Sequence, residues 1–290
     1  MKEFAGRTAI VTGGASGIGL AMAERFAAAR MNVVLADIEE SALEAAVSDM
    51  QGRQLEVTGV VTNTMHKASI SAAFDKAIEA YGKVHILCNN AGVGTIGSNA
   101  GIWEVPEKDW TWVMGVNFYG VLYGVQVAVP HMLGHGEPSH IVNTASLAGL
   151  LPSGGAYGVS KHAVLALTEG LYRDLKNRNA NIGASVLCPG FVSTNIYAAE
   201  RNRPADLASS RDADPLAVQM TKAVLEQGKA PDEIADIVFN SIEEDRLYIL
   251  PHPAWDSTVL SRVEHILARG GMMTIDPDEM AKRRNDGEIF

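Results

Sequence analysis

A phenol and an ammonium group lie four residues apart in the segment Tyr157-Gly-Val-Ser-Lys161. On an α-helix, residues at this spacing share one face, so the two groups can act together. A neighbouring cation stabilises phenolate over phenol and lowers the tyrosine pKa from its usual value near ~10. We therefore predict that Tyr157 exchanges a proton with an alcohol or carbonyl oxygen and that Lys161 assists it.

Two further polar residues strengthen this interpretation, since a Tyr-x-x-x-Lys pair alone is common on helix surfaces. Ser146 follows a predicted strand, 11 residues before Tyr157, and its hydroxyl can hold the same substrate oxygen. Asn117 interrupts an apolar helix within Val116-Asn-Phe-Tyr-Gly-Val121. This amide is either a satisfied polar group of the core or a local break that organises a water between Lys161 and solvent.

A glycine-rich loop, Thr12-Gly-Gly-Ala-Ser-Gly-Ile-Gly19, joins the first predicted strand to the first predicted helix. Gly13 permits the turn off the strand, and Gly17 and Gly19 let the backbone and the helix approach a pyrophosphate. The N-terminus of the following helix offers free N–H groups and a positive dipole end to phosphates. The loop therefore predicts a dinucleotide cofactor; the simpler alternative is a tight strand-to-helix turn.

Asp37 ends the second predicted strand, 18 residues after Gly19. A carboxylate at this place accepts hydrogen bonds from the adenosine ribose hydroxyls and repels a 2′-phosphate. The glycine loop holds no lysine or arginine, and Ile38, Glu39 and Glu40 follow Asp37. We therefore expect NAD rather than NADP; the alternative is that Asp37 only caps the next helix.

Short apolar, β-branched runs alternate with helical stretches along most of the chain. Continuous hydrophobic strands, each followed by a helix, indicate a parallel sheet that is covered on both faces. Strands are predicted at 8–12, 32–37, 55–61, 84–89, 140–144, 182–187 and 247–250. Helices are predicted at 18–29, 39–50, 107–133, 156–178 and 232–243, and a further helix follows the third strand and ends at residue 81. The expected fold is α/β: a single Rossmann-type, doubly wound, parallel seven-stranded sheet with helices on both faces and a C-terminal helical tail.

The chain is expected to form one dinucleotide-binding and catalytic domain over residues 1–255, followed by a tail at 256–290 that acts as a lid or interface. Within this domain, the polar segment 197–220 is expected to cover the substrate; the alternative for both segments is an ordinary solvated surface. The apolar side chains expected at the pocket are Tyr197, Ala198, Ala199, Leu207, Leu216, Met220, Ile96, Leu147 and Leu150. They favour a medium-sized, largely apolar secondary alcohol or ketone.

Composition narrows the class of protein. The 290 residues carry 24 Lys and Arg against 34 Asp and Glu, a formal net charge of −10. Nucleic-acid phosphates and anionic lipids repel an acidic chain, so we expect neither partner. No apolar run reaches the ~20 residues of a membrane span, and two cysteines 100 residues apart form no disulfide framework. The expected location is therefore cytoplasmic. We expect no metal site at His131, His135 and His140, which lie at a helix end and in a turn.

The ordered motifs resemble those of the short-chain dehydrogenase/reductase (SDR) family over about residues 5–252. They are the glycine loop, Asn89-Asn-Ala-Gly92, Asn117, Ser146 with Tyr157 and Lys161, and Pro189-Gly-Phe-Val-Ser-Thr194. The resemblance implies a catalytic tetrad of Asn117, Ser146, Tyr157 and Lys161, and a loop in which Val192 and Thr194 meet the nicotinamide carboxamide. Together with the motifs above, it gives the expected cofactor contacts as Gly13, Ser16, Gly17, Ile18, Gly19, Asp37, Ile38, Val61, Asn90, Ala91, Gly92, Tyr157, Lys161, Pro189, Val192 and Thr194.

Two features depart from the family pattern. Val60 occupies the place of an acid that usually bonds the adenine amine, and the interval between Ser146 and Tyr157 is slightly short. Neither change touches a reacting atom. The resemblance also implies a homodimer or homotetramer built on the helices at 107–133 and 156–178.

The predicted activity is NAD-dependent hydride transfer between the cofactor and a small-molecule secondary alcohol or ketone. One alternative is an NADP-dependent ketone or ketoacyl reductase; a carrier-bound ketoacyl substrate would need a basic face such as Arg201, Arg203 and Arg211. Another is a sugar-nucleotide epimerase or dehydratase, which shares Tyr-x-x-x-Lys. A non-catalytic dinucleotide-binding sensor would have no need for Ser146, Tyr157 and Lys161 together.

Overall fold

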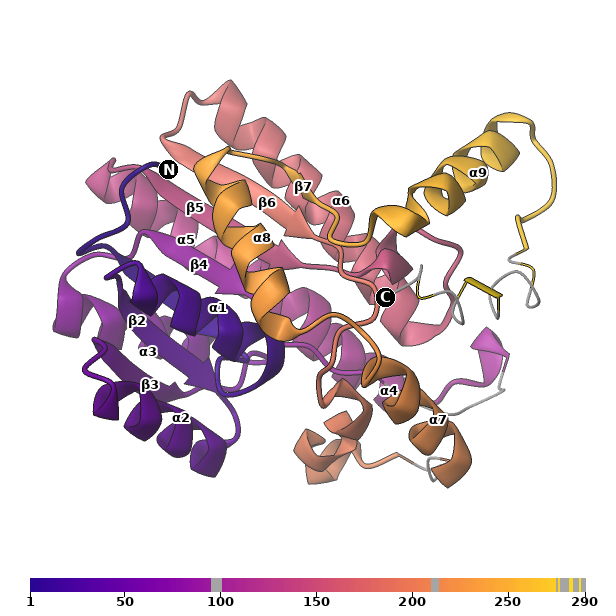
Figure 1. The fold of residues 1–290 in the computed structure, drawn as a ribbon, viewed down its shortest axis with the longest axis horizontal. Helices are drawn as coiled ribbons and strands as arrows, with labels where there is room; N and C mark the ends of the chain where they lie inside the picture. Colours follow the sequence, from indigo (N-terminus) through magenta and orange to yellow (C-terminus); the bar gives the residue numbers. More distant parts are fainter. Residues whose placement is uncertain (95–100, 210–213, 275, 277–281, 284–286, 288–290) are drawn as a thin grey trace.

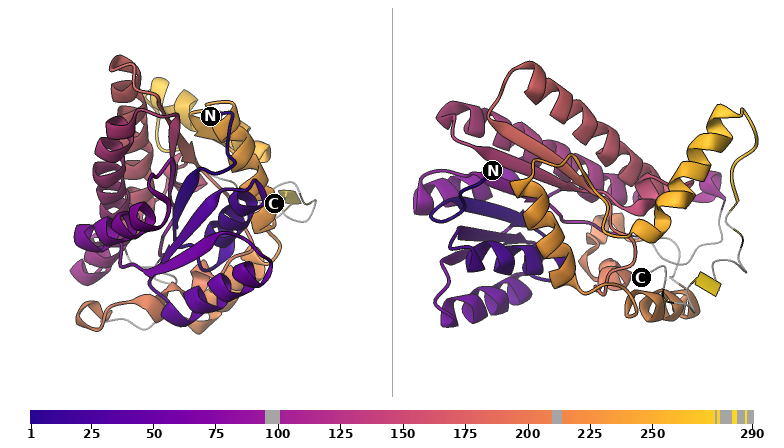
Figure 2. Two further views of the ribbon diagram at one scale, coloured as in Figure 1. Left: turned by 90° about the vertical axis from the view of Figure 1, so that its left-hand side faces the viewer. Right: turned by 45° about the horizontal axis from the view of Figure 1, so that its top comes forward.

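The computed structural model describes residues 1–94, 101–209, 214–274, 276, 282, 283 and 287. Within these residues, a sheet of seven parallel strands lies between two layers of helices (Figures 1 and 2). The strands are β1 (Thr8–Thr12), β2 (Asn32–Asp37), β3 (Val57–Val61), β4 (Ile86–Asn89), β5 (Ser139–Thr144), β6 (Ile182–Leu187) and β7 (Tyr248–Ile249). Their spatial order is β3-β2-β1-β4-β5-β6-β7, which confirms the predicted doubly wound α/β fold.

The chain enters the sheet at its middle and builds outward in both directions. From β1 it proceeds through β2 to the edge strand β3, and then returns to place β4 on the other side of β1. The strand order therefore reverses between β1 and β4, and a ligand crevice forms at the carboxyl ends of the strands at such a point. Every residue of β1 is buried, which explains why its centre, residues 9–11, is apolar without alternation.

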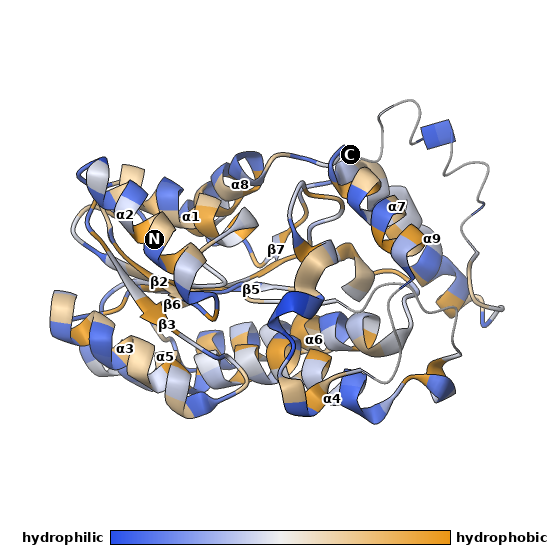
Figure 3. Cartoon of the chain, turned by 90° about the horizontal axis from the view of Figure 1, so that it is seen from below, coloured by the Kyte–Doolittle hydropathy of each residue, from blue (hydrophilic) through white to orange (hydrophobic). Residues whose placement is uncertain are grey.

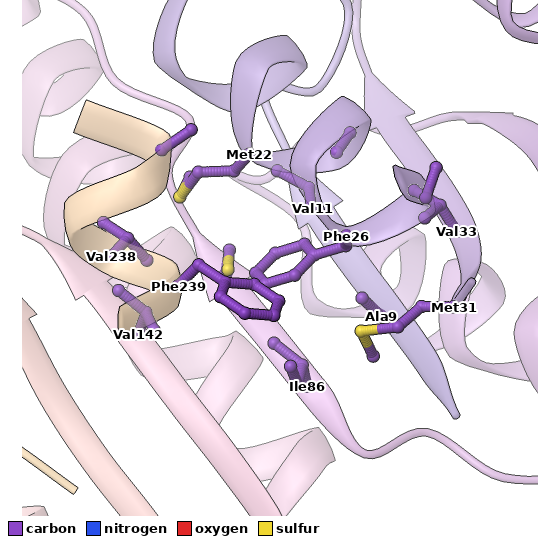
Figure 4. Packing of buried hydrophobic residues seen from close by; sticks show 14 of the residues in the cluster. Ala9, Val11, Met22, Phe26, Met31, Val33, Ile86, Val142, Val238 and Phe239 are labelled. Carbon is purple, nitrogen blue, oxygen red and sulfur yellow. The ribbon is translucent and has the colours of Figure 1, made fainter. Parts of the chain in front are cut away.

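Two layers of helices cover the sheet, as the view along its edge shows (Figure 3). On one face, α1 (Gly17–Ala28) and α8 (Pro231–Glu243) supply Met22, Phe26, Val238 and Phe239 to a core cluster (Figure 4). The helix α2 (Glu40–Gly52) lies on the same face (Figure 3). On the other face, α3 (Lys67–Tyr81), α5 (Gly120–His135) and α6 (Gly155–Asn177) pack on a second cluster. Burial on both faces holds rigid the strand ends that carry the site.

The single helix predicted at 107–133 has three parts. α4 (Glu107–Met114) continues through one π-helical turn, Gly115–Tyr119, into α5. By length and composition the stretch Glu107–His135 could cross a membrane, but Ala128 and Met132 belong to the second core cluster and α5 packs on α3. The π turn holds Asn117 at the point where the sequence suggested a local break.

The segment after β6 contains structure that the sequence analysis did not predict. It forms two 3-10 turns, Ile196–Asn202 and Ala205–Leu207, and then the helix α7 (Pro215–Leu225). The Asp214 carboxylate accepts a hydrogen bond from the Leu216 N–H at 2.9 Å, which caps α7, and Pro215 occupies its first position. After β7, a 3-10 turn at Pro253–Trp255 leads into α9 (Asp256–Leu267), the expected tail helix.

Candidate active site

A cavity of about 610 Å³ lies at the carboxyl ends of the strands, where the order reverses. Residues from five loops that follow strands line it, together with α6 and the segment after β6. The predicted site residues among them are Gly13, Ser16, Gly17, Ile18, Asp37, Ile38, Asn90, Ala91, Gly92, Ser146, Tyr157, Lys161, Pro189, Val192 and Thr194. Gly19, Val61 and Asn117 do not line it. The structure thus brings the two halves of the predicted site, more than 100 residues apart, to one cavity.

The glycine loop forms a tight cradle at the start of α1. Gly13 and Gly17 have φ angles of +62° and +54°, a region that favours glycine. A Cβ atom on Gly19 would lie 2.0 Å from the Gly13 carbonyl oxygen and 2.6 Å from Nδ2 of Asn90. The exposed Ser16 side chain makes no cap bond to α1, so the first N–H groups of that helix are open to a ligand at the cavity. This arrangement fits a pyrophosphate.

We expect Gly19→Ala to disrupt the cradle. Because the added methyl group would collide with backbone, the loop must move, and overpacking of this kind costs about 1–3 kcal/mol. The temperature of thermal unfolding and the affinity for the dinucleotide should both fall. Gly170→Ala in α6 is the matched control, since its Cβ would meet nothing within 4 Å and should add up to about 1 kcal/mol of stability. A Gly19→Ala protein with unchanged stability and binding would contradict the tight cradle.

Asp37 connects the cradle to the next helix while it lines the cavity. Its Oδ2 accepts a hydrogen bond from the Ala15 N–H at 2.9 Å, and its Oδ1 accepts one from the Glu39 N–H at 3.0 Å. Each carboxylate oxygen has a second lone pair. Asp37 therefore bonds the residue just before α2 without being the cap of that helix, and it has the acceptor capacity that a ribose diol needs.

Ser146, Tyr157 and Lys161 meet beside this cradle. Lys161 Nζ donates a hydrogen bond to the Thr144 carbonyl at 2.9 Å and lies 5.6 Å from the centre of the Tyr157 ring. The Ser146 hydroxyl accepts a hydrogen bond from the Ala148 N–H at 3.1 Å and donates to the Pro189 carbonyl at 3.4 Å. The backbone at the end of β5 thus fixes the lysine, and the loops after β5 and β6 fix the serine.

Burial governs the protonation of the tyrosine and the lysine. It raises the pKa of Tyr157, and the hydroxyl of Ser146 opposes this by hydrogen bonding. Burial also lowers the pKa of Lys161 to about 8. The expectation that the nearby cation lowers the tyrosine pKa is therefore wrong for the protein alone: burial is the main cause of the shift, and the opposing effect comes from Ser146 rather than from Lys161.

Asn117 is buried and connects the loop after β4 to the helix that carries Tyr157. Its Oδ1 accepts a hydrogen bond from the Val93 N–H at 2.8 Å, and its Nδ2 donates to the Val93 carbonyl at 2.9 Å and to Ser160 Oγ at 3.1 Å. Ser160 Oγ in turn donates to the Tyr157 carbonyl at 2.7 Å. The amide is thus a satisfied buried group that ties the loop after β4 to α6.

The rest of the cavity wall is mainly apolar. Its residues include Met65, Trp112, Val116, Leu147, Leu151, Phe191, Ile196, Ala199, Leu225 and Trp255. Trp255 comes from the turn before α9 and packs with Leu147 and Leu151. The sequence does not predict Trp112 and Trp255 at the wall: it favours core or subunit packing for the tryptophans at 103–112 and a subunit interface for Trp255, because it does not show which cavity such side chains reach.

Several pocket expectations need correction. Leu216 and Met220 are 62% and 61% exposed, because α7 turns Thr221 and Leu225 toward the cavity instead. Tyr197, Ala198, Leu207 and Leu150 do not line it either, and Ile96 lies outside the described residues. Val61 is 50% exposed, whereas Thr62 and Asn63, which follow β3, line the cavity.

The arginines after β6 are paired with acids. Arg203 lies 4.0 Å over the Trp112 ring and contacts Asp109 at 2.9 Å and Glu200 at 2.6 Å. Arg201 contacts Glu39 at 2.6 Å, and Arg211 lies outside the described residues. These ion pairs neutralise two of the three arginines considered for carrier-protein docking.

The histidines considered for a metal have ordinary structural partners. His131 Nε2 accepts a hydrogen bond from the Val84 N–H at 3.0 Å, His135 contacts the Val84 carbonyl at 3.1 Å, and His140 contacts Ser185 Oγ at 2.7 Å. Across the described ranges, no three His, Cys, Asp or Glu side chains form a group that could hold a metal ion.

The sheet is doubly wound and parallel, and the glycine loop lies where its strand order reverses. Beside this loop, a buried lysine lies next to a tyrosine and a serine. These features together define a dinucleotide-dependent oxidoreductase. A family model described as short chain dehydrogenase matches residues 7–205, and the chain belongs to this family. Its members act on hydroxyl and keto groups, and the cofactor is a nicotinamide dinucleotide.

Relatives resemble the chain over nearly its whole length. A "CLA biosynthesis dehydrogenase/reductase" of Lactiplantibacillus plantarum is 35% identical, over 93% of this chain and 96% of that protein. A "C alpha-dehydrogenase" of Sphingobium is 31% identical, over 98% and 92%. The crystal structure of a short-chain dehydrogenase/reductase from Burkholderia phymatum in complex with NAD is 45% identical, covers 95% of this chain and 99% of that chain, and superimposes with a TM-score of 0.91.

Proposed function

We propose that the protein is an NAD-dependent dehydrogenase of a medium-sized, largely apolar secondary alcohol, or a reductase of the matching ketone. One observation carries the proposal: Ser146, Tyr157 and Lys161 line the same cavity as the glycine cradle and Asp37. A structure 45% identical to this chain was solved with NAD, which supports the choice of cofactor.

The residues present suit each part of the dinucleotide. The cradle and the open N-terminus of α1 would hold the pyrophosphate, and Asp37 would accept hydrogen bonds from the adenosine ribose. Lys161 would hold the nicotinamide ribose, and Val192 and Thr194 would meet the carboxamide. The bound nicotinamide supplies the carbon that accepts or gives the hydride.

The polar groups of the cavity handle the substrate oxygen and its proton. Ser146 and Tyr157 would hold that oxygen between their hydroxyls, and Tyr157 would take its proton as the C–H hydride leaves. The raised pKa of Tyr157 makes a nearby cation important, because it must offset the cost of phenolate formation away from water. Lys161 is placed to provide it.

The apolar wall formed by Trp112, Leu151, Phe191 and Trp255 supports a substrate with little charge. We propose that the segment 197–220 covers this substrate within a domain at 1–255 and that the tail at 256–290 extends the cover, since Trp255 precedes it directly. A carrier-bound ketoacyl substrate is less well supported, because Arg201 and Arg203 are paired with acids.

A screen of secondary alcohols and ketones with NAD and NADP in parallel tests the proposal. Absorbance of the reduced cofactor reports turnover. We expect NAD to exceed NADP in kcat/KM by roughly 10–100-fold, because a 2′-phosphate must approach the Asp37 carboxylate. A preference for NADP would overturn the role of Asp37, and the absence of turnover with every neutral substrate would overturn the substrate class.

We propose a homodimer or homotetramer built on α5 and α6. Leu133 of α5 and Val159 of α6 are exposed large apolar residues, as is Tyr119 in the adjoining π turn.

We also propose a cytoplasmic location. Both cysteines are buried and free, which suits a reducing compartment.

A further inference from the structure

A bidentate ion pair joins the segment after β6 to the start of α2. Arg201 Nε lies 3.0 and 3.1 Å from the two Glu39 carboxylate oxygens, and Nη2 lies 2.6 Å from Oε1. Asn202 Nδ2 donates to the same Oε1 at 2.8 Å. The guanidinium and the amide hold the pKa of Glu39 below its usual value, so this carboxylate is ionised at neutral pH.

The contact is fixed at both of its ends. Arg201 Nη1 donates to the Ala198 carbonyl at 2.8 Å and to the Asn195 carbonyl at 3.3 Å, so the guanidinium is anchored to its own 3-10 turn. On the other side, the Glu39 N–H donates to Asp37 Oδ1. The pair is therefore a defined arrangement rather than two long side chains that meet by chance in solvent.

Both members of the pair line the cavity together with Asp37, at the end where the adenosine ribose would lie. The charges gathered there are two carboxylates and one guanidinium, a net charge of −1. Arg201 is the residue among these three that could attract a 2′-phosphate, and Glu39 occupies two of its donors. Its charge is thus offset by a carboxylate two residues along from Asp37.

We propose that Glu39 is a second determinant of cofactor selectivity, which acts by holding and neutralising the Arg201 guanidinium at the adenosine end of the cavity. The inference rests on the proposed NAD preference and names a residue beyond Asp37 that sustains it. If Glu39 lost its charge, Arg201 would keep its place at the cavity and could pair with a 2′-phosphate. If Arg201 lost its charge, the site would hold two unopposed carboxylates.

The same pair also connects the covering segment to α2, so a purely mechanical role has to be separated from a role in charge selection. If the pair were only a mechanical connection, a clasp between the two segments, removing either member would break it. Loss of Glu39 and loss of Arg201 would then change binding in the same direction, for NAD and NADP alike. Charge selection predicts opposite directions for the two variants, and for NADP only.

The test measures dissociation constants of NAD and NADP by titration calorimetry for the wild type, Glu39→Gln and Arg201→Gln. We expect Glu39→Gln to tighten NADP binding roughly tenfold and Arg201→Gln to weaken it roughly tenfold, which corresponds to one charge in each direction. The dissociation constant of NAD should change by less than about threefold in both variants. Added salt should shrink both NADP effects.

Glu44→Gln in α2 and Arg178→Gln after α6 are matched controls, since both residues are exposed and away from the cavity lining. These two substitutions make the same charge changes and should leave the ratio of the NADP and NAD dissociation constants unchanged. Shifts of both cofactors in one direction by both test variants would overturn the inference in favour of a clasp, and an unchanged ratio in both would overturn it outright. A wild type that prefers NADP would refute the proposed cofactor, whereas the opposite shifts between variants would still support the role of Glu39.

Discussion

Tyr157→Phe is expected to lower kcat by about 10²–10⁴-fold, the range for loss of a positioned proton donor or acceptor. The phenol oxygen is the group that exchanges the proton, and the ring that remains still fills its place in the cavity wall. Dinucleotide binding should stay within about twofold of the wild type, because Asp37 and the glycine cradle are unchanged. Steady-state kinetics and calorimetric titration check the two statements separately.

Tyr172→Phe supplies the control for this experiment. Tyr172 lies on the same helix α6 and packs on the second core cluster, away from the cavity lining. Its replacement should leave kcat unchanged. A Tyr157→Phe enzyme that retained most of its activity would refute the assignment of the proton transfer to this residue.

Lys161→Met is expected to abolish most activity and yet to leave the fold at least as stable at pH 7. A buried ammonium whose pKa falls from 10.5 to about 8 costs roughly 3 kcal/mol of folding free energy. Methionine removes this cost but leaves the Thr144 carbonyl without its donor, at about 1–3 kcal/mol. The balance at pH 7 lies between about 0 and 2 kcal/mol in favour of the variant.

The pH dependence of this difference tests its cause. Between pH 8 and 10.5 the unfolded chain binds the lysine proton more strongly than the folded protein does. The wild type therefore gains stability as the pH rises through this window, and the variant does not. Thermal unfolding should show the advantage of Lys161→Met shrinking toward pH 10. Lys176→Met is the control: Asp245 raises the pKa of Lys176, so its stabilising contribution is present throughout this window and is lost only above pH 10.5, and the stability difference from the wild type should stay constant between pH 8 and 10. For Lys161→Met, a constant difference across the window would contradict the buried charge.

The fold was predictable because burial on both faces leaves a simple pattern in the sequence. Strands such as Thr8–Thr12 are buried throughout and have a continuous apolar centre, and each strand up to β6 is followed by a helix. Parallel order then sends all carboxyl ends to one side, so Ser146 and the glycine loop had to approach each other. The alternation of strand and helix gave the seven strands, and most motifs of the family lie at the carboxyl ends of those strands.

The parts that the sequence analysis missed depend on contacts distant in the chain or on a shift of one residue. Glu39 and Arg201 are 162 residues apart, and no periodicity connects them. At the end of β3, Val61 points to solvent while Thr62 and Asn63 line the cavity. The start of α7 did carry a local signal, Asp214-Pro215, but its polar surroundings obscured it. The tyrosine pKa depends on burial, which only the assembled cavity defines.

The π turn at Gly115–Tyr119 makes the active-site frame sensitive to the length of the chain. A π turn is equivalent to one extra residue inserted into an α-helix. Deleting any single residue there would close the wide turn into a regular α-helix and change the direction in which the residues of the turn point. Asn117 would then face away from Val93 and Ser160, even if every named side chain were kept. Among homologous chains, a one-residue gap at this point should therefore be rarer than any substitution at its neighbours.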